Sequence, residues 1–455
     1  MLLQHQTPKC KYYGVHDIQR LPQLAKFSDV ERLAMKAVAH VLPFRTNSYV
    51  IEELIDWDNV PDDPIFRLIF PHPDMLVSKD RNQVMALLKR NAPTQDIKAV
   101  ANTIRRKLNP HPAGQKDYNV PMLNGLPVQG VQHKYRETAL LFPTAGQTCH
   151  SYCTYCFRWP QFVGMDNLKF ATRESGRFQD YLRQHKEITD VLLTGGDPMT
   201  MKSWQLDLYI APLFQPEFDH IRTIRIGTKS LAYWPYRFVS DPDADATLSL
   251  FERVIQSGKH LAIMAHVSHY RELSTPIAQT AIRRVRSTGA EIRCQAPLIR
   301  HVNDSVDALR ETWQTEVELG CIPYYMFVER QTGAQHYFEL PLAQAFKLYR
   351  EAVQHLSGLA RTVRGPVMSC LPGKVSIDGV VTVRGEKVFV LSFLQSRDQN
   401  WYKVSFFAKF DPEANWFTDL SPAFGEEHFF FEQSLNEILQ AIRLAHQASE
   451  LPVMA

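Results

Sequence analysis

The chain has 455 residues, of which 45% are hydrophobic and 22% charged, a composition typical of folded globular proteins with one large domain or roughly two to three smaller ones. Its 51 lysines and arginines nearly balance 48 aspartates and glutamates, and no basic run is long enough to indicate a nucleic-acid surface. No apolar run could cross a bilayer, and the N-terminus MLLQHQTPKCKYYG lacks the apolar core of a secretory signal. We therefore expect a cytoplasmic protein that binds neither nucleic acid nor membrane.

The first part of the chain, residues 1–133, is predicted to be mainly helical. Residues 28–42 begin with a serine that can cap a helix and continue with apolar residues at helical spacing. Residues 81–90 and 94–108 predict two further helices. Residues 108–133 are rich in proline and glycine, so we expect a connection there.

Residues 134–360 alternate short apolar runs with helical stretches. The runs predict six strands, at 138–145, 191–196, 223–228, 261–267, 291–298 and 322–328. Six strand–helix units in series indicate an α/β fold with a parallel sheet. In such folds the active site forms at the carboxyl ends of the strands. Residues 361–455 are predicted to be rich in β-structure, with a last helix near 432–449.

Three cysteines stand close together after the first predicted strand. Cys149, Cys153 and Cys156 have the spacing C-x3-C-x2-C, and their thiolates can bind three corners of a four-iron, four-sulfur cluster. Such clusters usually have four cysteine ligands, so a triplet leaves one iron open to a small molecule. A structural zinc site also needs a fourth ligand, and the adjacent His150 is poorly placed to be one. Chance grouping of buried cysteines is the other alternative. Because the number of cysteines is odd, a disulfide framework is not expected. The seven cysteines are Cys10, Cys149, Cys153, Cys156, Cys294, Cys321 and Cys370.

A second motif, Thr194-Gly195-Gly196-Asp197-Pro198, follows the second predicted strand and so lies at the same edge of the sheet. Glycines allow the backbone to approach a ligand closely, and an aspartate can accept hydrogen bonds from an ammonium group. The alternative is an ordinary tight turn.

The cysteine motif, with Tyr155 before its last cysteine, resembles the signature of the radical S-adenosylmethionine (SAM) superfamily. The resemblance implies that SAM chelates the open iron and that an electron from the reduced cluster cleaves SAM to a 5′-deoxyadenosyl radical. The second motif resembles the segment that receives the methionine amino group of SAM. Gly195, Gly196 and Asp197 are therefore expected to bind SAM.

Over residues 30–385 the chain also resembles the lysine 2,3-aminomutase family, with similar segments such as RIGTK, CQAPLIRHVND and YYMFVERQTGAQHYFELPL. The fold implied is a partial (β/α)6 radical SAM barrel in residues 134–360, with a helical N-terminal extension in 1–133 and a β-rich C-terminal extension in 361–455. The activity implied is that of an isomerase, which moves an amino group from the α to the β carbon of an amino acid with pyridoxal 5′-phosphate (PLP) as cofactor.

The resemblance implies roles for three residues. Lys374 ends the segment SGLARTVRGPVMSCLPGK, where the family carries the lysine that binds PLP, and it needs a lowered pKa to act as a neutral amine. Arg158 matches the arginine that pairs with the substrate carboxylate, a task that suits its forked donors. His266 is expected to face the PLP ring. The alternatives are an exposed loop lysine, a solvated arginine and a structural histidine.

The chain departs from the family at three places. Thr138 stands where the family has an arginine for the PLP phosphate, and Lys134 is the candidate replacement. Arg330 and Ser369 stand where the lysine-specific members present two aspartates to the substrate ammonium. The glycine-rich run before the PLP lysine is shortened to Leu371–Gly373. Since an arginine suits a carboxylate and repels an ammonium, we predict an amino acid substrate other than lysine, with an acidic side chain such as that of glutamate.

Alternatives remain open for Arg330 and for the function. Arg330 could instead pair with an internal acid such as Glu329 or Glu339. The chain could be a radical SAM enzyme of the same fold that acts on another substrate without PLP, or a non-catalytic, cluster-bearing interaction protein. For the favoured aminomutase we expect a one-electron donor such as flavodoxin or ferredoxin, and homo-oligomers are known for the family.

Overall fold

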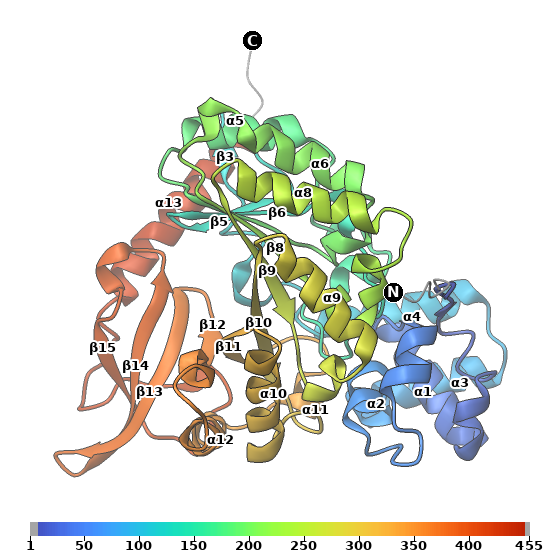
Figure 1. The fold of residues 1–455 in the computed structure, drawn as a ribbon. Coiled ribbons are helices and arrows are strands. Elements are labelled where there is room, and N and C mark those ends of the chain that lie inside the picture. Colours follow the sequence, from blue (N-terminus) through green and yellow to red (C-terminus); the bar gives the residue numbers. More distant parts are fainter. Residues whose placement is uncertain (1–7, 451–455) are drawn as a thin grey trace.

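The computed structural model describes residues 8–450 and is built around one 11-stranded sheet (Figure 1). Residues 1–7, the first half of the N-terminal segment 1–14 that was searched for a secretory signal, lie outside the described range. Seven adjacent strands run parallel. They are β6 (Thr138–Leu141), β7 (Asp190–Leu193), β8 (Thr223–Thr228), β9 (His260–His266), β10 (Glu291–Leu298), β11 (Ile322–Val328) and β12 (Arg364–Ser369). The first six coincide with the predicted strands, which confirms the α/β barrel, and β12 adds a seventh.

The sheet continues past the barrel at both edges. β5 (Val131–Tyr135) pairs antiparallel with β6 at one edge. At the other edge β13 (Gly373–Val383), β14 (Glu386–Ser396) and β15 (Ser405–Lys409) follow β12 in antiparallel order. The predicted β-rich tail is thus hydrogen-bonded to the barrel. β13 begins beside the cavity described below.

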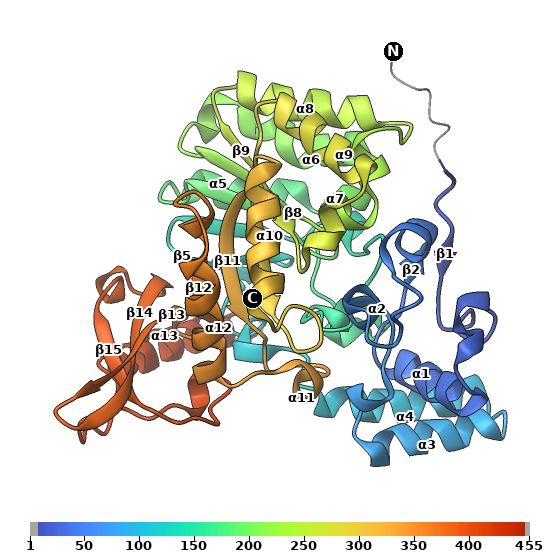
Figure 2. The same ribbon diagram turned by 60° about the horizontal axis from the view of Figure 1, so that its bottom comes forward.

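Helices lie along the outer face of the curved parallel strands (Figures 1 and 2). Their apolar faces pack on the sheet: Phe178 of α5 and Phe251 of α8 are buried in one core with strand residues such as Ile263 of β9. The helices are α5 (Ser175–Gln184), α6 (Ser203–Ile210), α8 (Ala244–Gln256), α9 (Pro276–Ser287), α10 (Val306–Glu318) and α12 (Leu342–Gln354). In the described range, no helix is long and apolar enough to cross a membrane.

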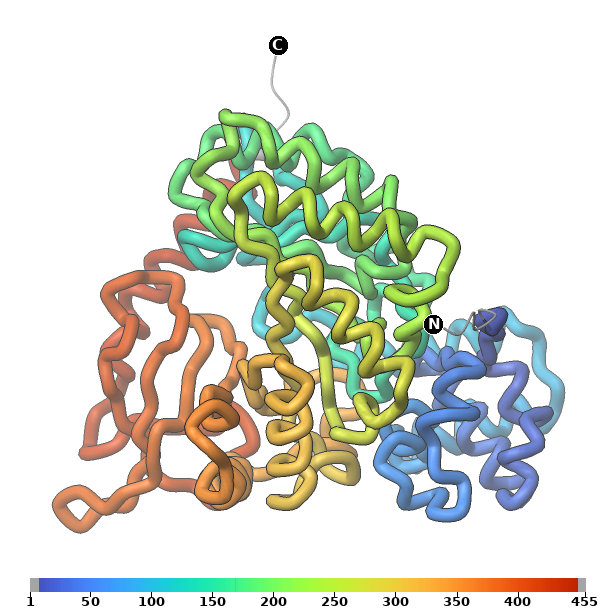
Figure 3. The backbone as a smooth tube through the Cα atoms, in the orientation of Figure 1, coloured from blue at the N-terminus to red at the C-terminus, as the bar shows by residue number. Residues whose placement is uncertain are grey.

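The N-terminal helices form a small bundle on the side of the barrel opposite the C-terminal strands (Figure 3). α1 (Asp29–Val41), α3 (Ser78–Lys89) and α4 (Thr94–Lys107) pack on one another. Ser28 and Glu31 cap α1 reciprocally, since each side chain accepts a hydrogen bond from the backbone of the other residue. The predicted helix at 28–42 is therefore confirmed.

The C-terminal strands and α13 (Glu432–Glu450) enclose an aromatic core. Phe393 of β14 is fully buried, and its ring lies 5.0 to 5.7 Å from those of Phe431, Phe406 and Trp401. Aromatic packing of this kind contributes strongly to stability. The tail is therefore a folded part of the molecule with a core of its own.

Replacing Phe393 with alanine tests this core. Phe393→Ala should destabilise the protein by about 3–5 kcal/mol, the usual cost of removing a buried ring. The measurement is the midpoint of urea unfolding, with Tyr402→Ala as control because Tyr402 is 58% exposed. Equal midpoints for the two variants would show that the tail does not depend on this core.

Candidate active site

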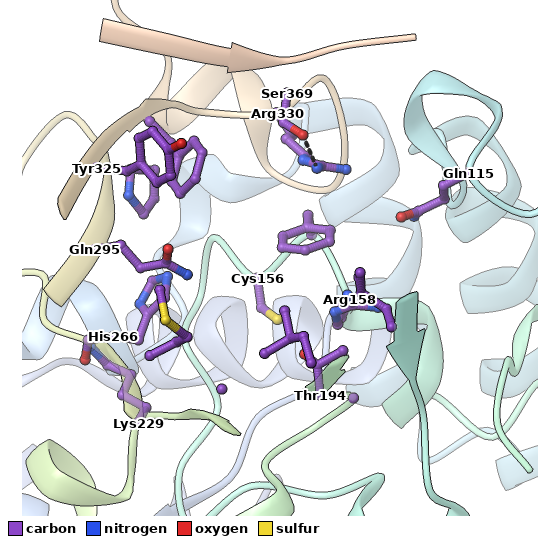
Figure 4. Close-up of a pocket in the computed structure, with 18 of the residues that line it drawn as sticks. Gln115, Cys156, Arg158, Thr194, Lys229, His266, Gln295, Tyr325, Arg330 and Ser369 are labelled. Atoms are coloured by element: carbon purple, nitrogen blue, oxygen red, sulfur yellow. Dashed lines mark hydrogen bonds between the residues drawn. The ribbon is translucent and has the colours of Figure 1, made fainter. Parts of the chain in front are cut away.

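One cavity of about 320 Å³ is lined by all the cofactor- and substrate-binding residues predicted from the sequence. It opens at the carboxyl ends of the parallel strands and extends toward β13. Figure 4 shows Cys156 between His266 and Arg158, with Arg330 and Ser369 across the cavity from Thr194. The predicted site residues in its wall are Lys134, Thr138, Cys149, Cys153, Cys156, Arg158, Thr194, Gly195, Gly196, Asp197, His266, Arg330, Ser369 and Lys374.

The cysteine loop is held by the N-terminal region. The backbone N–H of Tyr152 donates to the carbonyl of Arg45 at 2.8 Å, and that of Thr154 donates to the carbonyl of Leu68 at 2.9 Å. His150 is buried and its Nδ1 lies 2.9 Å from the hydroxyl of Ser230. These contacts turn the cysteines toward the cavity and keep His150 in the protein interior.

The three thiols share an environment that opposes charge. Burial raises the pKa of Cys149, Cys153 and Cys156, and for Cys149 and Cys156 repulsion from other thiols of the triplet adds to the effect. Three thiolates are therefore stable together only next to positive iron. No group of three His, Cys, Asp or Glu side chains within residues 8–450 is spaced to hold a single metal ion. A cluster binds each thiolate at a different iron, and the triplet fits that larger group.

The glycine motif packs directly against the residue before Cys149. A Cβ on Gly195, whose φ is +144°, would lie 2.1 Å from Nε2 of Gln147, and one on Gly196 would lie 2.5 Å from the backbone N of Thr148. Only glycine fits such close approaches. The two motifs therefore form one continuous wall of the cavity.

Asp197 fixes the end of that motif from inside. Its carboxylate accepts four hydrogen bonds of 2.7 to 3.0 Å, from the hydroxyls of Thr228 and Ser230 and from the backbone N–H groups of Met199 and Lys229. Four donors use the acceptor positions of a carboxylate. Its oxygens are thus engaged within the protein, and what the motif offers a ligand is its glycine backbone.

Lys374, the second residue of β13, extends into the cavity. Its Nζ donates to Oε1 of Gln395 at 2.6 Å and lies 4.9 Å from the ring centre of Tyr325 and 5.5 Å from that of Tyr135. Burial lowers the pKa of Lys374 to about 7, helped by repulsion from nearby arginines. A substantial fraction of this lysine is therefore a neutral amine near neutral pH, as attachment to an aldehyde requires.

Beside Lys374 lie the groups closest to the expected phosphate position. Nζ of Lys134 hydrogen-bonds to the carbonyl of Cys370. Thr138 donates to Asp190 at 2.9 Å, and Asp190 also pairs with Nε and one terminal nitrogen of Arg225. Burial lowers the pKa of Lys134 well below its usual range, and a phosphate beside it would favour its charged form. Lys134 and Arg225 each keep further N–H groups for a ligand, so the two residues fit a phosphate group.

Two arginines face the cavity without an acidic partner. The guanidinium carbons of Arg158 and Arg330 lie 4.9 and 4.3 Å from the ring centre of Phe157. Arg330 donates to Ser369 at 2.8 Å, and neither arginine makes an ion pair within residues 8–450. Burial lowers the pKa of both, to about 9 for Arg158, so both remain cations at neutral pH.

The internal acids do not neutralise Arg330. Burial raises the pKa of Glu329 well above its usual range despite the neighbouring arginine, which disfavours its carboxylate form. Glu339 accepts from Gln335 at 2.6 Å instead. The positive charge of Arg330 is therefore left for a ligand.

His266 lies on the opposite side of the cavity as a neutral ring. Its Nδ1 is 3.1 Å from the hydroxyl of Tyr155, and burial lowers the pKa of His266 to about 3, with repulsion from Lys229 adding to the effect. Lys229 pairs with the buried Glu272 at 2.6 Å. This side of the cavity is polar but carries no unpaired charge.

The cavity wall carries more basic than acidic side chains. Among the described residues, its acids are Asp197 and Glu329, and its basic groups are Lys134, Arg158, Arg225, Lys229, Arg330 and Lys374. Arg225 and Lys229 pair with Asp190 and Glu272, and burial lowers the pKa of Lys134 and Lys374, so the positive charge rests mainly on Arg158 and Arg330. Such a wall suits anionic ligands. Sequence reasoning missed Gln395, Tyr135, Tyr325 and Phe157, which surround the predicted residues. Strand pairing brings the first three to the site, and Phe157, which directly follows Cys156, carries no polar group that would have indicated a role.

The chain resembles characterised proteins over most of its length, although no family model matches it. A putative L-lysine 2,3-aminomutase of Aquifex aeolicus (strain VF5) is 32% identical over 89% of this chain and 94% of that relative. The L-lysine 2,3-aminomutase of Escherichia coli (strain K12) is 29% identical over 55% of this chain and 69% of its own length. That of Clostridium subterminale is 26% identical over 60% and 62%. SuiB of Streptococcus suis bound to precursor peptide SuiA superimposes with a TM-score of 0.35 at 12% identity, over 61% of this chain and 58% of that one.

Substituting Gly196 tests the joint wall of the two motifs. In Gly196→Ala the new Cβ must push Thr148 away, at a cost of about 1–3 kcal/mol, and Cys149 moves with it. We expect SAM affinity to fall about tenfold or more, together with a lower iron content after anaerobic reconstitution. Gly176→Ala is the control, since a Cβ there meets nothing within 4 Å. Unchanged SAM affinity and iron content in Gly196→Ala would refute this arrangement.

Proposed function

Because the chain belongs to the lysine 2,3-aminomutase family, we propose that it is a radical SAM, PLP-dependent aminomutase whose substrate is an amino acid with an acidic side chain. Membership of the family implies a four-iron, four-sulfur cluster and SAM as cofactors. The use of PLP and the choice of substrate are the proposal. The pair of unpartnered arginines, Arg158 and Arg330, carries it.

The arginines fit a substrate with two carboxylates. Each binds a carboxylate through forked donors, and leaving two cations without anions in a confined cavity is costly. A dicarboxylate amino acid supplies one carboxylate to each and brings two negative charges. The lysine side chain would instead place its ammonium near Arg330, which is repulsive. These charges favour glutamate or aspartate over lysine.

The other residues have complementary tasks. Cys149, Cys153 and Cys156 would hold the cluster, and the backbone of Gly195 and Gly196 would receive the methionine end of SAM. The cluster and SAM supply a radical that removes hydrogen from the substrate, and PLP supplies a π-system for the migrating nitrogen. The protein orients these groups and excludes water.

The cavity also fits PLP. Lys374 offers a neutral amine for the aldehyde, and Lys134 and Arg225 offer N–H groups for the phosphate. The rings of Tyr135 and Tyr325 lie within reach of Lys374 and give the cofactor an aromatic surface. The hydroxyl of Thr138 already donates to Asp190. Thr138 therefore acts on the phosphate only indirectly, by holding Asp190, which in turn holds Arg225.

Substrate choice is tested by turnover. The reconstituted enzyme, incubated anaerobically with SAM and reductant, should convert glutamate or aspartate to its β-amino isomer and leave lysine unchanged. In Arg330→Ala, KM for the acidic substrate should rise about 10- to 100-fold, since a charged hydrogen bond contributes about 1.5–3 kcal/mol. Arg350→Ala, at an exposed position of α12, should match the wild type. Formation of β-lysine from lysine alone would rule out the acidic substrate.

PLP attachment is tested separately by borohydride trapping. Peptide mass spectrometry should locate the adduct at Lys374, and Lys374→Ala should lack it while Lys347→Ala, at a 72% exposed side chain, keeps it. Trapping should be faster above pH of about 7 than below it, because the amine is neutral above its pKa. SAM cleavage by a wild type that traps no PLP would favour the alternative enzyme that works without PLP.

A further inference from the structure

The C-terminal strand β14 contributes one side chain to the active site. Gln395 lies opposite Lys374 in the antiparallel pairing of β13 with β14, and its Oε1 accepts the 2.6 Å hydrogen bond from the lysine nitrogen. Both side chains line the cavity. Gln395 lies outside the motifs from which the site residues were predicted.

The surroundings of Lys374 are cationic and aromatic. No carboxylate makes an ion pair with it in the part of the chain that the structure describes. Its one hydrogen-bond partner is the neutral amide of Gln395. The charged and titratable groups that face it are Lys134 and Tyr135 of β5, Asp190 of β7, Arg225 of β8, Tyr325 of β11, Arg330 after β11 and Arg364 of β12.

An amide and a carboxylate would affect this lysine differently. An amide oxygen accepts a hydrogen bond from a neutral amine and from an ammonium alike. A carboxylate at the same distance would stabilise the ammonium strongly. The neutral amide of Gln395 thus directs Nζ of Lys374 toward the cavity. The protonation state of Lys374 is then set mainly by burial and by the other charged groups around it.

We propose that Gln395 is a positioning residue for Lys374, which aims the lysine nitrogen into the cavity without opposing it with a negative charge. This inference rests on the proposed attachment of PLP to Lys374. It also assigns β14 a part in the active site. The low pKa of Lys374 noted above agrees with such a partner.

The test measures the reactivity of Lys374 itself. Full-length reconstituted protein is methylated with formaldehyde and cyanoborohydride from about pH 6 to about pH 11.5, a range that includes the pKa of free lysine at about 10.4. Peptide mass spectrometry measures the modification of each lysine. In Gln395→Glu the midpoint for Lys374 should rise by about 1–3 pH units. Thr382→Glu adds the same charge at an exposed position of β13 and should leave it unchanged. Lys347 serves as the reference within each sample.

A second variant separates orientation from charge. Gln395→Leu removes the acceptor at similar size, so the midpoint should stay low while borohydride-trapped PLP forms about 2- to 10-fold more slowly, the loss expected for one neutral hydrogen bond. An unshifted midpoint in Gln395→Glu, or wild-type trapping in Gln395→Leu, would overturn the assignment. If the wild type traps no PLP yet Gln395→Glu shifts the midpoint, the proposed function falls and the effect of Gln395 on the amine stands.

Discussion

The antiparallel pairing of β12 with β13 is the constraint on which the site depends. It sets Ser369 directly opposite Lys374, so the two side chains emerge together on the cavity face. Ser369 in turn holds Arg330, and the carbonyl of Cys370 in the connecting turn holds Lys134. Because strand side chains alternate between faces, a slip of one residue would turn Lys374 away and release both other cations. One short hairpin therefore determines the positions of three charged groups.

Charge is distributed unevenly around this hairpin. Asp197, Asp190 and Glu272 are all engaged with protein donors, while Arg158 and Arg330 have no acid. Cations confined together repel one another, and the lowered pKa of Arg158 reports that repulsion along with burial. Anionic ligands relieve it, so occupancy of the cavity should stabilise the fold as well as enable turnover. The same imbalance discriminates against a substrate with a second ammonium group.

Local sequence patterns were enough to predict much of the barrel and of the candidate site. Six strands, the cysteine loop after the first of them and the glycine motif after the second follow from short stretches of chain, and all of the predicted site residues do line one cavity. The contact of Gln395 with Lys374 could not be predicted, because it depends on the register of β14, twenty-one residues away. The sequence suggested Asp197 as an acceptor for a ligand ammonium. Its four internal donors come from two separate segments, and no single-sequence pattern reveals such convergence.

The loop after β11 joins the two extensions at Arg330, the residue proposed to select the substrate. Thr332, two residues past Arg330, accepts from the indole N–H of Trp159 and donates to the carbonyls of Leu108 and Asn109 in the N-terminal region. The other attachment of Arg330 is Ser369, which leads into the C-terminal strands. The loop that carries Arg330 is thus held by the N-terminal region and its guanidinium by Ser369, and rigid placement makes charge discrimination effective. A change of specificity toward lysine would require acidic groups at both 330 and 369, because Ser369 and the ring of Phe157 are arranged around a guanidinium. On the proposed function, the barrel would supply the radical chemistry, and the two extensions together would decide which substrate side chain can enter it.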